Sequence, residues 1–408
     1  MIALTGPDLD RRPLIVFWES TKACPLSCRH CRASAISGPL PGELSREEAQ
    51  RFLGTLTGFG EPNPVLVVTG GDALMRDGLD ELVRTARGLG VPVALSPTVS
   101  PLLTAGRITA LQRLGVKAVS ISLDGASPET HDGIRQKRGH FEATLRALRL
   151  LRERGFTVQV NTVVMHENVG ELARVARIVK EAGAAVWEVF FLIRLGRGKE
   201  LAEPSPAENE DICHFLFDAS RYGFVVRTVE GPFFRRVVAW RKSDAEAADP
   251  VAEYRLGRLY KALSGELRER LGEPAAEARA HTKATRDGRG IVFVAHDGSV
   301  YPAGFLPLPL GNVKTESVVE IYRESALLRD IRAARFRGRC GSCEYADACG
   351  GSRARAYAAF GDPLGEDPAC AYVPRLGGQS TSASPRRPAS AALQSPAPDA
   401  VATRKGAA

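Results

Sequence analysis

The chain of 408 residues is 44% hydrophobic and 25% charged, which is typical of a globular protein with room for a large domain and a smaller one. It has no run of about 20 apolar residues and no secretory signal in its first twelve residues, so we expect a cytoplasmic protein without a membrane partner. The net charge of +8 is spread along the chain, without basic runs interleaved with aromatic residues. This pattern argues against a nucleic-acid partner and is compatible with an anionic small-molecule substrate.

Short apolar runs alternate with amphipathic stretches in the first half of the chain. The runs predicted to be strands are 14–18, 65–69, 91–96, 118–123, 157–164 and 186–193. The stretches predicted to be helices are 45–59, 79–89, 105–114, 141–154 and 169–182. This repeated order predicts parallel strands with right-handed crossovers, and six units are too few for an eight-fold barrel. We therefore expect an α/β fold, a partial (β/α)6 barrel with its site at the carboxyl ends of the strands.

Composition divides the chain into five segments. They are an N-terminal segment 1–12, the barrel 13–200, a helical connector 201–284, a small C-terminal domain 285–375 and a tail 376–408. The connector is predicted to carry little chemistry. The C-terminal domain begins with a predicted β-hairpin around His296-Asp297-Gly298, because Asp-Gly favours the positive φ angles of a tight turn. The tail is rich in Ser, Ala, Pro and Gly and is predicted to be disordered.

The first group of cysteines follows the first predicted strand directly. In a chain without a secretion signal, clustered cysteines are more often metal ligands or catalytic groups than disulfides. Cys24, Cys28 and Cys31 have the spacing C-x3-C-x2-C. Three thiolates leave one iron of a four-iron cluster open to bind and activate a small molecule. The alternative is a chance spacing or a zinc site completed by His30, which is disfavoured because zinc sites usually add a second cysteine pair.

This cysteine motif resembles that of the radical S-adenosylmethionine (SAM) superfamily, which places it on the loop after the first strand. Gly70-Gly71-Asp72, after the second strand, resembles the Gly-Gly-Glu-Pro signature of that family, with Asp72 in place of glutamate. The resemblance implies that a 4Fe-4S cluster binds SAM and that His30 lies against its adenine. It also implies that the glycines let backbone carbonyls approach the methionyl amine, because no Cβ intervenes.

Later strand ends carry further residues that match the family pattern. The resemblance implies that Ser122 and Asp124 contact SAM and that Arg135 approaches its carboxylate. Ser96 and Asn161 are implied as contacts to the ribose. For each of these polar residues alone, a capping or turn role is equally open. The sequence singles out no catalytic acid or base.

A second group of cysteines lies near the C-terminus. These residues are Cys340, Cys343, Cys349 and Cys370. Four thiolates can ligate a 4Fe-4S cluster completely, which suits electron transfer or a structural role, and tetrahedral zinc is the alternative. The segment resembles the auxiliary domain called twitch, a shortened form of the seven-cysteine SPASM domain. Because Ala303 and Arg353 stand where SPASM cysteines are expected, we expect one auxiliary cluster.

The string from Cys349 to Cys370 narrows the resemblance to radical SAM proteins of the alternative heme pathways. It implies hydrogen abstraction by a 5′-deoxyadenosyl radical and oxidative decarboxylation of a tetrapyrrole propionate, with the auxiliary cluster accepting the remaining electron. A ferredoxin or flavodoxin is implied as the electron donor. The arginines that could bind propionates are Arg194, Arg197, Arg353 and Arg355, and an ion-paired or solvated role is equally open for the last two.

Two other functions compete with this interpretation. Maturation of a ribosomally made peptide is one, although the roughly thirteen residues before the first strand are too few for the peptide-binding domain that such relatives carry. A non-catalytic iron–sulfur electron carrier or redox sensor is the other, which the Gly-Gly-Asp loop disfavours. Strand aromatics such as Trp18, Trp187 and Phe190 are predicted to lie in the core, and Cys213 is predicted to be a buried thiol.

Overall fold

The computed structural model describes residues 8–243, 249–280 and 285–374, and these residues build one ten-stranded sheet. The strands are β1 (Ile15–Glu19), β2 (Val65–Thr69), β3 (Val93–Leu95), β4 (Ala118–Ser122), β5 (Thr157–Val164), β6 (Val186–Phe191), β7 (Val225–Val229), β8 (Ile291–Val294), β9 (Ser299–Tyr301) and β10 (Gly311–Asn312). Their order across the sheet is β10-β9-β8-β1-β2-β3-β4-β5-β6-β7, parallel from β8 to β7 and antiparallel among β8, β9 and β10.

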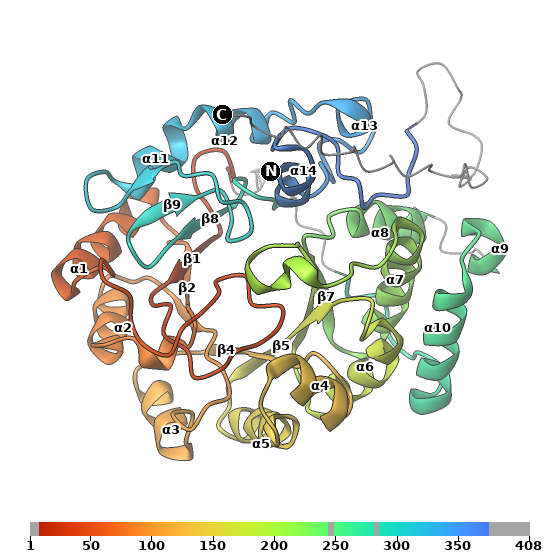
Figure 1. The fold of residues 1–408 in the computed structure, drawn as a ribbon, viewed down its shortest axis with the longest axis horizontal. Helices are drawn as coiled ribbons and strands as arrows, with labels where there is room; N and C mark the ends of the chain where they lie inside the picture. Colours follow the sequence, from red (N-terminus) through yellow and green to blue (C-terminus); the bar gives the residue numbers. More distant parts are fainter. Residues whose placement is uncertain (1–7, 244–248, 281–284, 375–408) are drawn as a thin grey trace, which may run out of the picture.

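The described residues also form α-helices, most of which cover the outer face of this curved sheet (Figure 1). They are α1 (Arg46–Thr55), α2 (Leu79–Gly88), α3 (Ala105–Arg113), α4 (Pro128–Arg135), α5 (His140–Glu153), α6 (Leu172–Glu181), α7 (Pro206–Ala219), α8 (Phe234–Ser243), α9 (Pro250–Tyr254), α10 (Arg258–Leu271), α11 (Val318–Glu324), α12 (Ala326–Arg332), α13 (Gly338–Gly341) and α14 (Arg353–Phe360). Short 3-10 helices occupy Leu56–Phe59, Ala73–Met75, Val169–Glu171, Gly196–Glu200 and Ser220–Tyr222. Within the described ranges, no helix is both long and apolar enough to span a membrane.

Buried apolar side chains and partly exposed polar side chains alternate along the strands, so one face of the sheet forms the core and the other lines the barrel interior. In β5, Val158 and Val160 are buried against the outer helices, whereas Gln159 and Asn161 point inward and stay partly exposed. Trp18 and Trp187 are fully buried, as predicted, and the Trp187 indole N–H donates to Thr162 Oγ1 at 2.9 Å. The inner face of the barrel is therefore polar enough to receive a ligand.

The six predicted strands are confirmed, each within two residues at either end. The predicted hairpin is confirmed as β8 and β9, and β8 pairs in parallel with β1, with Ile15 opposite Ile291. The prediction of a helical connector is only partly correct, because residues 225–229 form the strand β7 at the edge of the sheet. This strand is short and half polar, so its sequence carries a weak strand signal. The predicted tail, 376–408, lies outside the described residues.

The C-terminal segment closes the open side of the barrel. It is blue in Figure 1, where α14 lies between the β8–β9 hairpin and the β7 edge. Ala354 of α14 packs with Ile193, which follows β6, and with Leu306, which follows β9. The two domains therefore share a packed boundary at the carboxyl ends of the strands.

The outer helices depend on apolar side chains packed against the sheet. We expect Leu111→Ala in α3, where the side chain is fully buried, to lower the free energy of unfolding by about 2 to 5 kcal/mol. Leu102→Ala, at a position 45% exposed before the same helix, is the control and should change it by at most about 0.5 kcal/mol. Urea unfolding of both variants at equal iron content measures the difference, and equal losses would contradict this packing.

Candidate functional site

The first thiol site lies on the loop after β1, at the carboxyl end of the barrel. Cys24 and Cys28 are buried and Cys31 is half-buried. The Arg197 guanidinium holds this loop, because Nε donates to the Cys28 carbonyl and Nη1 to the Ala35 carbonyl, both at 2.9 Å. Arg197 was expected as a propionate ligand, and the structure instead makes it a brace for the cysteine loop.

The donor set of this loop fits an iron–sulfur cluster. Burial raises the pKa of Cys24 to about 11, so the thiol carries its proton until a metal displaces it. Among the residues that the structure describes, no three Cys, His, Asp or Glu side chains lie close enough to share a single metal ion. Cysteine thiolates are the usual ligands of iron–sulfur clusters, and this loop supplies three of them. His30 is directed to Asp124, which argues against the zinc alternative.

The Gly70-Gly71-Asp72 loop packs directly on the cysteine loop. The Gly71 N–H donates to the Thr21 carbonyl at 2.8 Å, and the Asp72 N–H donates to the Ala23 carbonyl at 2.7 Å. A Cβ on Gly70 would lie 2.5 Å from the Thr21 oxygen, and one on Gly71 would lie 2.4 Å from the Ala23 oxygen. The structure thus gives the glycines a role that the sequence did not suggest, which is the close approach of two backbones.

Asp72 ties this loop to the end of β3. Its carboxylate accepts from Ser100 Oγ at 2.8 Å and from the Leu74 N–H at 3.0 Å. Burial raises the pKa of Asp72 and these hydrogen bonds oppose the rise. The carboxylate therefore joins the loops after β2 and β3, while the Asp72 backbone N–H binds the cysteine loop, which fits a positioning role at this site.

Asp124, at the end of β4, gathers two of the other predicted residues. Its carboxylate pairs with Arg135 Nη2 at 2.6 Å and with His30 Nε2 at 2.9 Å, and it accepts the Val163 N–H at 2.8 Å. Burial alone would raise the pKa of Asp124, but Arg135 and His30 outweigh it and hold this pKa well below its usual range. Arg135 Nη1 also lies 3.7 Å from Cys28 Sγ. Three residues predicted separately thus form one network at the cysteine loop.

The remaining predicted contacts lie along the barrel interior. Ser122 and Asn161 pair in register on β4 and β5, and both are half-buried. Ser96 follows β3, and its N–H donates to the Val68 carbonyl at 2.9 Å. The row of Ser122 and Asn161 continues to two residues that our sequence analysis missed, Glu188 on β6 and Arg227 on β7. Their inward position in alternating strands is the signal that could have identified them.

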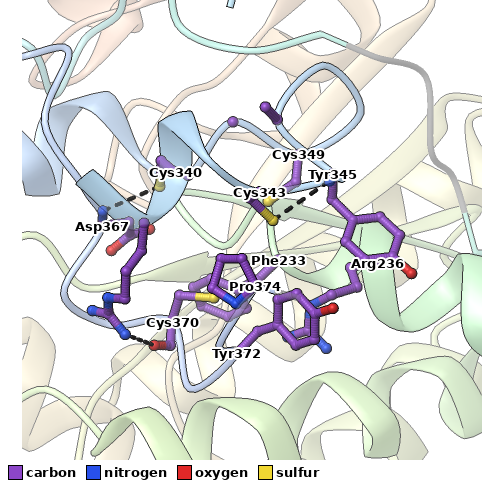
Figure 2. Close-up of a pocket in the computed structure, with 14 residues that line it drawn as sticks. Phe233, Arg236, Cys340, Cys343, Tyr345, Cys349, Asp367, Cys370, Tyr372 and Pro374 are labelled. Carbon is purple, nitrogen blue, oxygen red and sulfur yellow. Dashed lines mark hydrogen bonds between the residues drawn. The ribbon is translucent and has the colours of Figure 1, made fainter. Parts of the chain in front are cut away.

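The second thiol site is a cavity between the C-terminal domain and the connector. Figure 2 shows Cys340, Cys343, Cys349 and Cys370 around this space, with Phe233 and Tyr372 lining it. Burial raises the pKa of Cys343 to about 11 and that of Cys370 to about 12, so metal binding must displace these protons. The Asp367 N–H donates to Cys340 Sγ at 3.4 Å, which is a hydrogen bond of the kind that tunes iron–sulfur clusters.

The connector supplies a buried cation to this cavity. Arg236 of α8 forms a bidentate pair with Glu210 of α7, at 2.7 and 2.6 Å. Its guanidinium lies over the rings of Trp240 and Tyr372, at 4.2 and 4.8 Å from their centroids. Arg236 also acts electrostatically on Cys370. The prediction that the connector carries little chemistry is therefore wrong.

Arg353 and Arg355 are buried structural residues and not free propionate ligands. Arg353 donates to the carbonyls of Pro363 and Gly365, and its Nη2 lies 3.7 Å from Cys340 Sγ. Arg355 pairs with Glu203 at 2.9 Å and also donates to the Leu192 carbonyl at 3.0 Å. Cys213 is fully buried, as predicted.

Some known proteins are similar to this chain in sequence, and others are similar to it in fold. The AdoMet-dependent heme synthase of Methanosarcina barkeri is 35% identical over 376 residues, which are 92% of this chain and 99% of that enzyme. The AdoMet-dependent heme synthase of Oleidesulfovibrio alaskensis is 34% identical over 88% of each chain. SuiB of Streptococcus suis bound to S-adenosylmethionine has a TM-score of 0.63 at 13% identity, over 88% of this chain and 77% of that one. SuiB is also known bound to its precursor peptide SuiA.

Two family models match parts of the chain, one containing Cys24, Cys28 and Cys31 and the other containing Cys340 and Cys343 of the second thiol site. The radical SAM superfamily model matches residues 18–179, and the SPASM model, an iron–sulfur cluster-binding domain, matches residues 286–345. The chain therefore belongs to the radical SAM superfamily. It is an enzyme that uses SAM and carries a second iron–sulfur cluster in its C-terminal domain, as predicted from the sequence. Within the superfamily it resembles the AdoMet-dependent heme synthases.

The glycine contact predicts a sharp steric effect. We expect Gly71→Ala to push the cysteine loop away from the loop after β2 and to lower 5′-deoxyadenosine formation by roughly tenfold or more, because a misplacement of about 1 Å can cost about a hundredfold in rate. Gly38→Ala is the matched control, since a Cβ there meets nothing within 4 Å. Chromatography of the nucleoside product measures both, and equal rates in the two variants would contradict the steric role.

The Asp124 network predicts a loss of both stability and SAM binding. Asp124→Asn leaves the Arg135 charge buried without its partner, and we expect a cost of about 3 to 5 kcal/mol in the free energy of unfolding. We also expect weaker SAM binding by equilibrium dialysis, because His30 loses its anchor. Glu167→Gln, which removes the surface partner of Arg29, should cost at most about 1 kcal/mol. Unchanged SAM affinity in Asp124→Asn would reject the positioning role.

Proposed function

We propose that this enzyme oxidatively decarboxylates propionate side chains of an iron tetrapyrrole in heme formation. The observation that carries the proposal is the 35% identity to an AdoMet-dependent heme synthase along 99% of that enzyme. In the proposed reaction, a hydrogen atom leaves the propionate carbon next to the macrocycle, the carboxylate leaves as carbon dioxide, and one electron is passed on. The product side chain is then a vinyl group.

The proposed cluster ligands are the cysteines of the two thiol sites. Cys24, Cys28 and Cys31 would hold the cluster whose bound form supplies the electron for cleavage of SAM, and the four C-terminal cysteines would hold the auxiliary cluster. Around the first cluster, Asp124 orients His30 and Arg135. We propose Ser96 and Asn161 as contacts to the ribose and Ser122 as a further contact to SAM, because they lie on the inner face or at the carboxyl ends of β3 to β5.

The barrel mouth has the surface that a flat, anionic macrocycle requires. The rings of Phe190 and Phe305 are half-buried and lie 6.2 Å apart, so the prediction that Phe190 lies in the core is wrong. The Arg32 guanidinium pairs with Glu19 at 2.6 Å and lies 4.8 Å from the ring centroid of Phe293 and 5.8 Å from that of Phe305. Arg194, which lies close to Phe190 in the sequence, is exposed. Aromatic faces can pack on a tetrapyrrole ring, and guanidinium groups suit its carboxylates.

Electron transfer completes the proposed cycle. The auxiliary cluster would accept the electron that decarboxylation leaves behind, and a reduced ferredoxin or flavodoxin would supply the electron for SAM cleavage. Such donors and SAM are available in the cytoplasm, which is the location that we propose. Four thiols, of which Cys349 is buried and the other three are half-buried, and the surrounding arginines suit a cluster that exchanges electrons and binds no substrate.

Peptide maturation is the second candidate, supported by the similarity to SuiB bound to its precursor peptide. That likeness is at 14% identity and supports a common fold more than a common substrate. The heme synthases share more than twice that identity with this chain. The carrier or sensor alternative is disfavoured because the chain belongs to a family of enzymes.

A mass measurement tests the substrate. After anaerobic reconstitution to about eight irons per chain, SAM and dithionite should yield 5′-deoxyadenosine. Added iron-coproporphyrin should then lose the mass of one carbon dioxide and two hydrogen atoms for each propionate converted. The Cys24→Ala, Cys28→Ala, Cys31→Ala chain should do neither and is the control. Active SAM cleavage with unchanged porphyrin would reject the tetrapyrrole and leave the radical SAM assignment in place.

A further inference from the structure

Glu230 is a buried carboxylate that the proposed reaction does not use. It follows β7 directly, and its φ of +57° is in the left-handed region, which a residue other than glycine rarely adopts. Its side chain is 6% exposed and accepts a hydrogen bond from Ser352 Oγ. Arg355 donates to the backbone carbonyl of Glu230 at 2.9 Å, so this guanidinium binds the main chain of Glu230. Strained buried residues of this kind cluster at functional positions.

Glu230 lies in a buried cluster of acids that share their cations. Its acidic neighbours are Asp287, Asp367 and Glu203, and the guanidinium groups that act on this cluster include Arg355, Arg353 and Arg235. Arg355 is shared, because it pairs with Glu203 at 2.9 Å, lies 3.5 Å from Asp367 and donates to the Glu230 carbonyl. A buried site of this composition favours keeping one proton.

A short path of hydrogen bonds links Glu230 to the auxiliary cluster site. Ser352, whose hydroxyl binds the Glu230 carboxylate, donates its backbone N–H to Asp367 at 2.7 Å. Asp367 in turn donates its backbone N–H to Cys340 Sγ at 3.4 Å. The Glu230 carboxylate accepts from Ser352 Oγ and the Asp287 carboxylate from the Ala354 N–H, and both donors follow Cys349 in the chain. A charge change on the cluster therefore acts on Glu230 through a buried region of low dielectric.

We propose that Glu230, paired with Asp287, takes up one proton when the auxiliary cluster takes up one electron. The electron comes from an external low-potential reductant and enters the cluster, and the proton comes from water and binds a carboxylate oxygen of Glu230. No other bond forms or breaks. The added negative charge on the cluster favours the protonated acid, and the added proton in turn favours the reduced cluster. The proposal rests on the auxiliary cluster and not on the tetrapyrrole.

The acid–base properties of Glu230 agree with this coupling. Burial and the Asp287 carboxylate raise the pKa of Glu230 to about 8, against the opposing effects of Ser352 and Arg355. Below that pKa the acid is protonated in both redox states, so the midpoint potential is independent of pH. Above it, the oxidised state has lost the proton and reduction restores it. The midpoint potential then falls as pH rises, by up to 59 mV for each tenfold drop in proton concentration.

The test is a redox titration of the auxiliary cluster alone, followed by electron paramagnetic resonance. The full chain with Cys24, Cys28 and Cys31 replaced by alanine removes the SAM-binding site, and dithionite is the reductant. We expect a flat midpoint potential near pH 7 and a falling one between about pH 8 and 10. Glu230→Gln keeps the hydrogen bond to Ser352 but has no proton to lose. The midpoint potential of this variant should be the same at every pH and equal to the value that the parent chain has at low pH.

Two further variants keep the outcome decisive. Asp287→Asn removes a like charge, so the fall should begin at lower pH than in the parent chain. Asp347→Asn is the matched control. The Asp347 carboxylate lies two residues from Cys349, but it is 75% exposed and therefore screened by water. In this variant the midpoint potential should depend on pH as it does in the parent chain. A flat potential in the parent chain, or a slope that survives in Glu230→Gln, would overturn the proposal. Neither result bears on the substrate, because this chain cannot cleave SAM.

Discussion

The first thiol site depends on one backbone contact, the approach of the loop after β2 to the cysteine loop after β1. Two amide groups, of Gly71 and Asp72, donate across this contact, and there is no room for a Cβ at Gly71. Parallel pairing of β1 and β2 brings the two loops to the same edge of the sheet. The fold thus places the thiols, and the glycines allow the last approach.

Each thiol site is bordered by a buried pair of a carboxylate and a guanidinium. Asp124 with Arg135 lies beside Cys28, and Glu210 with Arg236 lies beside Cys370. A buried charge without its partner costs several kcal/mol, so each pair fixes the geometry of its members more strictly than an apolar contact would. In both cases the guanidinium adds positive charge near sulfur, which favours a bound anionic cluster.

Much of this architecture follows from sequence, and the gaps have physical causes. The six strands were predictable because each apolar run is bounded by helical stretches, whereas β7 reads Val-Val-Arg-Thr-Val and alternates with a polar inward residue. The motifs identified His30, Asp124 and Arg135, but only the fold shows that they bind one another. The roles of Arg197 and Arg355 were not predictable, because their partners are backbone carbonyls and acids distant in sequence.

The auxiliary domain is joined to the barrel at both edges of its parallel strands, which fixes how the two sites face each other. On one edge, β8 pairs with β1 along four residues. On the other, Arg355 of α14 binds the carbonyls of Leu192 and Glu230, which follow β6 and β7. A six-strand barrel would be open to water on this side, and radical intermediates require its exclusion. The same contacts that close the barrel also hold Glu230, because Arg355 binds its backbone carbonyl, so closure of the barrel and the proposed proton uptake depend on one boundary.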